Sequence, residues 1–172
     1  MEFLIQNILN GNPDGFRQII QKYEKQLLKI AYHFIHDWDG AQDITQNTFI
    51  SLYKNLSKFD SSKAFEPWLY QIHFNQCRSD YRKRKIRNQM MKLFVAEKPS
   101  LDSYQVDSDI IRKCIDECTW KQKTAFILME IEGFSSKEAC EKMNCSDATA
   151  RVHLKRAKTN IQNKLRKLGY DT

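Results

Sequence analysis

Apolar residues recur at every third or fourth position along most of the chain, a period that is typical of amphipathic helices. The first run begins after a break at 12–15 and ends at a second break at 37–40. Its apolar face carries Phe16, Ile19, Ile20, Tyr23, Leu27, Ile30, Ala31 and Phe34. In the second run the inward positions are Ala41, Ile44, Thr48, Phe49, Leu52 and Leu56. A third helix is expected from about Pro67 into the high 80s or low 90s, since proline suits a first helical turn.

The second half of the chain carries clearer start and stop signals. Short apolar runs at 110–118 and 120–131 predict two helices, and Gly133 is expected to end the second as a C′ glycine. Ser135 and Glu138 have the spacing of a capping box, which predicts a short helix ending near 144. A final helix is expected after Ser146, with a seam made by Ala150, Leu154, Ala157, Ile161, Leu165 and Leu168. A short helix, a tight turn and a longer basic helix predict a helix-turn-helix.

Composition divides the chain into two parts. Residues 96–109 are polar and contain Pro99 and three aspartates, which is typical of an exposed linker. We therefore expect an N-terminal domain over 1–95, a linker over 96–109 and a C-terminal domain over 110–172. With only 5 glycines and 3 prolines among 172 residues, long stretches contain no helix breaker. The predicted fold class is all-α, with two small helical domains joined by a flexible linker.

The net charge of +7 is unevenly placed, and its placement indicates a polyanionic partner. Residues 78–92 hold 7 basic side chains against 1 acidic one, whereas 93–118 hold 3 basic against 6 acidic. From 151 to 167 there are 7 basic side chains and no acid, so two basic patches flank an acidic middle. This arrangement favours nucleic acid. A membrane surface fits less well, because no strong apolar face backs the basic segments and no stretch has the length and hydrophobicity of a membrane-inserted helix.

Aromatic and basic residues follow one another in the segment 59–87. The aromatic ones are Phe59, Phe65, Trp68, Tyr70, Phe74 and Tyr81. The basic ones are Arg78, Arg82, Lys83, Arg84, Lys85 and Arg87. Single-stranded nucleic acid needs both kinds, because its bases stack on rings and its phosphates bind cations. The alternative interpretation is that the rings form a helix core and the basic run is a solvated face, and the pattern alone leaves both open.

The cysteines indicate a reducing compartment. There are 5 of them, an odd number, and the chain start MEFLIQNILNGN lacks the basic and small-residue features of a secretory signal, so we expect a cytoplasmic protein with free thiols. The residues that could form a zinc site are Cys114, Cys118, Cys140, Cys145 and His153. None of their spacings is a CxxC knuckle, and free cysteines are commonly buried. We therefore expect no metal and no cofactor.

Four blocks of sequence occur in a characteristic order. They are NPDGFRQIIQKYEKQLLKIAY, AQDITQNTFISLYKNL, FEPWLYQIHFNQCRSDYRKRK and TWKQKTAFILMEIEGFSSKEACEKMNCSDATARVHLKRAK. In this order they resemble the opening helix, region 2.2, regions 2.3 and 2.4, and region 4 of a group IV (extracytoplasmic-function, ECF) sigma factor of the sigma-70 family of bacterial RNA polymerase. The resemblance covers nearly the whole chain. It implies a factor without catalytic residues that binds core polymerase, recognises the minus-thirty-five and minus-ten promoter elements and initiates transcription.

The resemblance also implies roles for residues of the N-terminal domain. Docking on the β′ clamp coiled coil of the polymerase is implied for Asp43, Gln46, Asn47 and Ile50. Capture of a flipped non-template base of the minus-ten element is implied for the loop at 57–65 with Lys58, Phe59 and Phe65, and for Asn75. Contact with that single strand is implied for Arg78, Arg82, Arg84 and Lys85.

In the C-terminal domain the residues themselves and the resemblance both predict a helix that binds DNA. A recognition helix would direct Asp147, Thr149, Arg151 and His153 toward base edges or phosphates, with Lys155 and Arg156 on the DNA backbone. The resemblance adds that Ser146 and the residues after it read the minus-thirty-five element as duplex. It also implies the β flap and an anti-sigma protein as partners. Gln42 and Asn47 stand where the family usually has Glu, which makes the docking stripe less acidic.

Two other functions compete with this interpretation. A plain helix-turn-helix regulator of duplex DNA would leave the aromatic segment and the region 2.2 block unexplained. An enzyme acting on nucleic acid finds little support, because the acids are scattered and no glycine-rich loop could cradle a phosphate. His33 and His36 lie on a predicted helix without a convincing third metal ligand.

Overall fold

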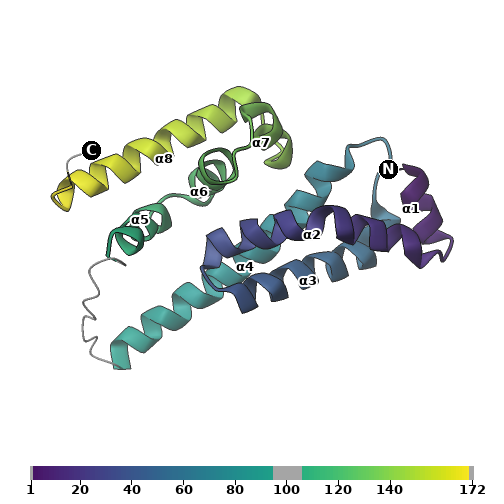
Figure 1. Cartoon of the computed structure of the whole chain (residues 1–172), viewed down its shortest axis with the longest axis horizontal. Helices are drawn as coiled ribbons and strands as arrows, with labels where there is room; N and C mark the ends of the chain where they lie inside the picture. The colour runs from purple at the N-terminus through teal and green to yellow at the C-terminus, as the bar shows by residue number, and fades with distance from the viewer. Residues whose placement is uncertain (1, 95–105, 171–172) are drawn as a thin grey trace. The chain divides into compact units, whose positions relative to one another are not determined.

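The computed structural model describes residues 2–94 and 106–170, and all regular structure within these ranges is helical (Figure 1). The chain divides into two compact units, Met1–Lys85 and Ile86–Thr172. The prediction of an all-α fold with two helical domains is confirmed. Most of the expected linker lies outside the described residues, and its last positions, from Val106 on, already belong to helix α5 (Val106–Asp116).

Unit 1 is built from α1 (Glu2–Leu9), α2 (Pro13–Ile35), α3 (Trp38–Asn55), the 3-10 turn η1 (Leu56–Lys58) and the N-terminal part of α4 (Phe65–Phe94). Helix α2 starts where expected, because the Asn12 side chain accepts a hydrogen bond from the Asp14 N–H (2.9 Å) and Pro13 occupies the first turn. It ends at His36, whose φ of 54° is left-handed. Helix α1 was not among the predicted helices.

Helices α2, α3 and α4 bury the core of unit 1. Every inward position predicted at 41–56 is buried, and so are most of those predicted on α2. Phe16 and Ile20 are exceptions, since both are only half-buried. The apolar face of α2 is therefore wider than the surface that its neighbours cover.

A fully buried histidine connects the helices of this core. His73 Nδ1 lies 3.0 Å from Thr48 Oγ1, and His73 Nε2 lies 3.5 Å from Cys77 Sγ. Burial lowers the pKa of His73 to about 3, although a hydrogen bond to the backbone of Leu27 acts in the opposite sense. The imidazole is therefore neutral at physiological pH and forms part of the packing between α2, α3 and α4.

Unit 2 contains α5, α6 (Trp120–Phe126), the π-helical turn η2 (Ile127–Ile131), α7 (Ser136–Lys142) and α8 (Asp147–Lys167). Gly133 follows η2 with a φ of 73°, which confirms its predicted role at a helix end. The capping box is also confirmed, because Glu138 N–H donates to Ser135 Oγ (3.3 Å) while Ser135 N–H donates to Glu138 Oε2 (2.8 Å). The π-helical turn itself was not predicted.

The core of unit 2 lies along one face of α8. Ala150, Ala157 and Ile161 are buried on that face, and Ile161 belongs to a cluster with Cys114 and Ile115 of α5. A buried lysine joins α6 to α5 by an ion pair between Lys123 Nζ and the carboxylate of Asp116. The opposite face of α8 stays exposed and carries Lys155 and Arg156, whereas Lys158 and Lys164 form ion pairs with Glu130 and Glu117.

Candidate functional site

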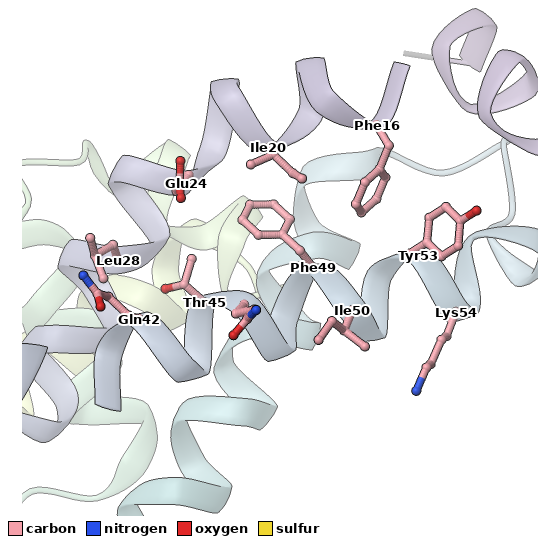
Figure 2. Close-up of a pocket in the computed structure, with 11 residues that line it drawn as sticks. Phe16, Ile20, Glu24, Leu28, Gln42, Thr45, Phe49, Ile50, Tyr53 and Lys54 are labelled. Carbon is pink, nitrogen blue, oxygen red and sulfur yellow. The ribbon is translucent and has the colours of Figure 1, made fainter. Parts of the chain in front are cut away.

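An apolar groove of about 660 Å³ runs between α2 and α3 in unit 1 (Figure 2). Its apolar lining is formed by Phe16, Ile20 and Leu28 from α2 and by Phe49, Ile50 and Tyr53 from α3. Its polar lining is formed by Glu24, Gln42, Thr45, Gln46 and Lys54. Figure 2 shows the Phe16 ring of α2 lying toward the rings of Phe49 and Tyr53 on α3.

Three aromatic rings that line the groove pack against one another. The Phe16 ring packs edge-on against the rings of Phe49 (centroids 6.4 Å apart) and Tyr53 (5.1 Å). Ile50 and Tyr53 nevertheless remain 44% and 59% exposed. Single exposed apolar residues are ordinary, but a contiguous apolar groove with a polar rim is typical of a protein interaction site.

Two of the four residues expected to bind polymerase line this groove. Gln46 and Ile50 line it, and Asp43 and Asn47 are exposed on the same helix. Sequence reasoning missed Phe16 and Ile20, which were assigned to the core because they continue the apolar face of α2. The available signal was the width of that face, which extends further than one neighbouring helix can cover.

Three of the six rings of the aromatic segment belong to the core. Phe65, Tyr70 and Phe74 are buried, and the ring centroid of Phe65 lies 6.1 Å from that of Tyr23 on α2. The Tyr70 hydroxyl donates a hydrogen bond to Gln26 Oε1 (2.9 Å). For these three rings the structure therefore supports the alternative interpretation of a helix core, and it corrects the prediction of Phe65 as a DNA-binding residue by placing that ring in the interior.

Two rings of the segment stay accessible beside the loop after η1. Phe59 and Trp68 are half-buried with their centroids 4.8 Å apart, while Lys58 and Asn75 are exposed. The loop is shaped by Asp60, whose Oδ1 accepts hydrogen bonds from the N–H and hydroxyl of Ser62 (3.1 and 2.7 Å). These hydrogen bonds lower the pKa of the Asp60 carboxyl.

The basic residues of α4 do not behave alike. Arg78, Arg82 and Lys85 are exposed. Arg84 is instead 25% exposed, and it donates from Nη1 to Asp37 Oδ2 (2.8 Å) and from Nε to Asp80. A Cβ at Gly40 would lie 2.0 Å from Arg84 Nη2, so this glycine provides the room for the guanidinium. Arg84 thus joins α4 to the start of α3 and is less available to DNA than was expected.

In unit 2 the start of α8 is well defined. Ser146 Oγ accepts a hydrogen bond from the Thr149 N–H (3.2 Å) and lies 2.7 Å from Thr149 Oγ1. The turn before α8 passes through Asn144 with a φ of 50°, and the N–H of Cys145 donates to the carbonyl of Cys140 (3.0 Å). The predicted side chain Ser146 therefore caps the helix, and the hydroxyl of the predicted Thr149 lies against this cap.

The remaining candidates on α8 lie on different sides of the helix. Arg151, Lys155 and Arg156 are exposed, whereas His153 is half-buried. Burial, together with Lys121 and Arg156, lowers the pKa of the His153 imidazole. Two positions along a helix differ by about 200° in direction, so Arg151 and His153 do not form one contact surface.

The two units match two parts of one family. The family model for Sigma-70 region 2 matches residues 19–87, and that for Sigma-70 region 4 matches residues 108–161. The chain belongs to the sigma-70 family. Its relatives place it among the ECF (group IV) sigma factors, which are transcription initiation factors of RNA polymerase and not enzymes.

Relatives match nearly the whole chain, and a solved structure has the same fold. The RNA polymerase sigma-H factor of Pseudomonas aeruginosa is 26% identical over 96% of this chain and 93% of the relative. The ECF RNA polymerase sigma factor SigW of Bacillus subtilis is 24% identical over 95% and 96%. The structure of CnrH in complex with the cytosolic domain of CnrY has the same fold, with a TM-score of 0.68 at 20% identity over 96% of both chains.

Within residues 2–94 and 106–170, no three His, Cys, Asp or Glu side chains lie close enough together to bind a metal ion. Burial raises the pKa of the thiols of Cys114, Cys118 and Cys145. No helix in the described part of the sigma factor combines the length and the hydrophobicity needed to cross a bilayer.

Proposed function

We propose that region 2 of this sigma factor docks on the β′ clamp coiled coil of core polymerase through the groove between α2 and α3. The supporting observation is that Gln46 and Ile50 of α3 line the apolar groove and that Asp43 and Asn47 are exposed on the same helix. An apolar centre with a polar rim is the usual anatomy of a protein interface. Ile50 and Tyr53 are then the side chains that become buried on docking.

We further propose that the loop after η1 and the exposed face of α4 hold the non-template strand of the minus-ten element. Phe59 and Trp68 offer ring faces, and Asn75 lies exposed on α4 after them. Arg78, Arg82 and Lys85 supply cations for the phosphates of that strand. Arg84 is assigned a different task, which is to keep α4 fixed against the start of α3.

Region 4 is proposed to bind the minus-thirty-five element as duplex DNA, with α8 in the major groove. Arg151 is the base-reading candidate because it is exposed on the outer face of α8, and Lys155 and Arg156 are placed to contact phosphates. The β flap is the proposed polymerase partner of this region. We infer that the factor acts in the cytoplasm, where it meets the polymerase.

An anti-sigma protein is the proposed regulator. The RpoE sigma factor of Bartonella quintana, which is 24% identical with a TM-score of 0.59 over 88% of this chain and 96% of its own, was solved in complex with the anti-sigma factor NepR. The exposed groove between α2 and α3 is the proposed target of this competitor.

The docking proposal is tested with two matched variants of full-length protein. Ile50→Glu places a charge in the groove, while Ile86→Glu makes the same change at another exposed isoleucine, 54% accessible, on α4. Burying the exposed 44% of Ile50 is worth about 1 kcal/mol, and placing an unpaired carboxylate in the buried groove costs more than that, so Ile50→Glu should raise the Kd for core polymerase at least about tenfold. Ile86→Glu should leave that Kd unchanged. Equal Kd values for wild type and Ile50→Glu would rule out docking through the groove.

A further inference from the structure

Arg151 is held by side chains from both helices of the helix-turn-helix. Its Nε donates to Asp147 Oδ2 (2.9 Å), one turn earlier on α8, and to Ser136 Oγ on α7 (3.3 Å). The side chain is nevertheless 65% exposed. All the hydrogen bonds and ion pairs that Arg151 makes with the described residues use Nε. The edge formed by Nη1 and Nη2 is therefore left for a ligand.

Asp147 has no oxygen left with which to read a base. Its Oδ2 binds Arg151, and its Oδ1 is enclosed and makes no hydrogen bond with any described residue. An enclosed oxygen does not reach a base edge, so Asp147 can affect recognition only through Arg151. This differs from the sequence expectation, in which Asp147 faced base edges or phosphates.

We propose that Asp147, helped by Ser136, positions Arg151 so that its Nη1–Nη2 edge reads one guanine of the upstream promoter element. The inference rests on the proposed function, in which α8 enters the major groove. Guanine is the base that fits, because its O6 and N7 are two acceptors that match the two donors of an arginine edge. Fixing the guanidinium in advance reduces the conformational entropy that is lost on binding.

Asp147 is then a positioning residue with a recognisable signature. A carboxylate on a DNA-facing helix repels phosphates and so weakens binding to every sequence. The same carboxylate sharpens the choice of guanine through Arg151. Removing it should therefore strengthen general DNA binding and weaken discrimination, whereas a merely structural defect would weaken both.

The test uses full-length protein, reconstituted with core polymerase, on a promoter library randomised in the upstream element. Sequencing the transcripts gives the preference for guanine at each position. Wild type should require guanine at one position, and Asp147→Ala should reduce that preference about threefold to tenfold, the cost of ordering one long side chain. Asp147→Ala should also bind duplex of unrelated sequence more tightly than wild type does.

Three further variants complete the design. Arg151→Ala should lose the guanine preference, and Asp147→Ala should have no additional effect on preference when combined with it. Asp147→Asn keeps an acceptor for Arg151 Nε and should retain most of the preference. This variant is the control for a folding defect caused by substitution at position 147. Glu141→Ala, which removes an exposed carboxylate from α7, should leave the preference unchanged.

Two results would overturn the proposal. In the first, Asp147→Ala keeps the full guanine preference that Arg151→Ala loses. In the second, Asp147→Ala changes the preference as strongly without Arg151 as with it, which would mean that Asp147 reads a base directly. A failure of the proposed function is visible separately, because wild type itself would then give no promoter-dependent transcripts, and the inference would fall with it.

Discussion

Titration of His73 should make the stability of region 2 depend on pH. Its pKa is about 3 in the folded state, against an ordinary value of 6.5. Between these values only the unfolded chain takes up the proton, so stability is full above pH 6.5 and falls as the pH drops toward 3. From pH 7.5 to pH 5 this group alone should remove about 2 kcal/mol of unfolding free energy. Urea unfolding at the two pH values, followed by tryptophan fluorescence, measures the difference.

Two variants separate His73 from the other groups that titrate in this range. His73→Gln stays neutral, so its stability should lose about 2 kcal/mol less than wild type does between the two pH values. Thr48→Val removes the hydroxyl that lies 3.0 Å from Nδ1 but keeps the imidazole, and it should lower stability by about 1–3 kcal/mol at both pH values while keeping the wild-type pH difference. Identical pH dependence in wild type and His73→Gln would refute the reasoning.

Two further predictions concern the arginines and rings of region 2. Arg84→Ala should lower the melting temperature because it leaves two carboxylates without their partner. Arg82→Ala should leave the melting temperature unchanged. It should instead make the binding of single-stranded promoter DNA less dependent on salt concentration, by the amount expected for the loss of about one phosphate contact. Phe65→Ala should cost about 3–5 kcal/mol of stability, since the ring is buried. Phe59→Ala should cost less and instead weaken binding to a pre-melted promoter fork by about 1–3 kcal/mol. Stable Phe65→Ala protein would contradict the assignment of that ring to the core.

The helix boundaries were predictable where a local signal sets them. Ser135 and Glu138 form their capping box within four residues of chain, and Gly133 ends a helix through its own left-handed φ. Such signals need no knowledge of the rest of the fold. The inward positions of α3 were predictable for a related reason, because a helix with one apolar stripe has only one face to bury.

The groove and the buried rings depended on packing between distant segments and were not predictable in the same way. Phe16 and Phe65 both lie on apolar helix faces, yet one lines an open groove and the other is covered by Tyr23 of α2. Which ring is covered depends on how α2, α3 and α4 meet, and periodicity within one helix does not contain that information.

Ion pairs with acidic side chains determine which of the predicted DNA-binding arginines are available to DNA. Composition showed that Arg84 and Arg82 belong to one basic run, but only Arg84 has a carboxylate from the α2–α3 corner beside it, 47 residues away in sequence. On α8 the spacing of Asp147 and Arg151 allowed a pair one turn apart, but the contribution of Ser136 from α7 required the folded helix-turn-helix.

Permanganate footprinting of the reconstituted holoenzyme tests the central claim most directly, on a duplex promoter found by sequencing its transcripts. The measurement reports unpaired thymines in the minus-ten segment and can be combined with protection of the upstream duplex. If region 2 holds the separated strand and region 4 holds paired DNA, the thymines of the minus-ten segment should react with permanganate. The upstream element should be protected and fully paired. Upstream protection with no reactive thymines at the minus-ten segment would contradict the account.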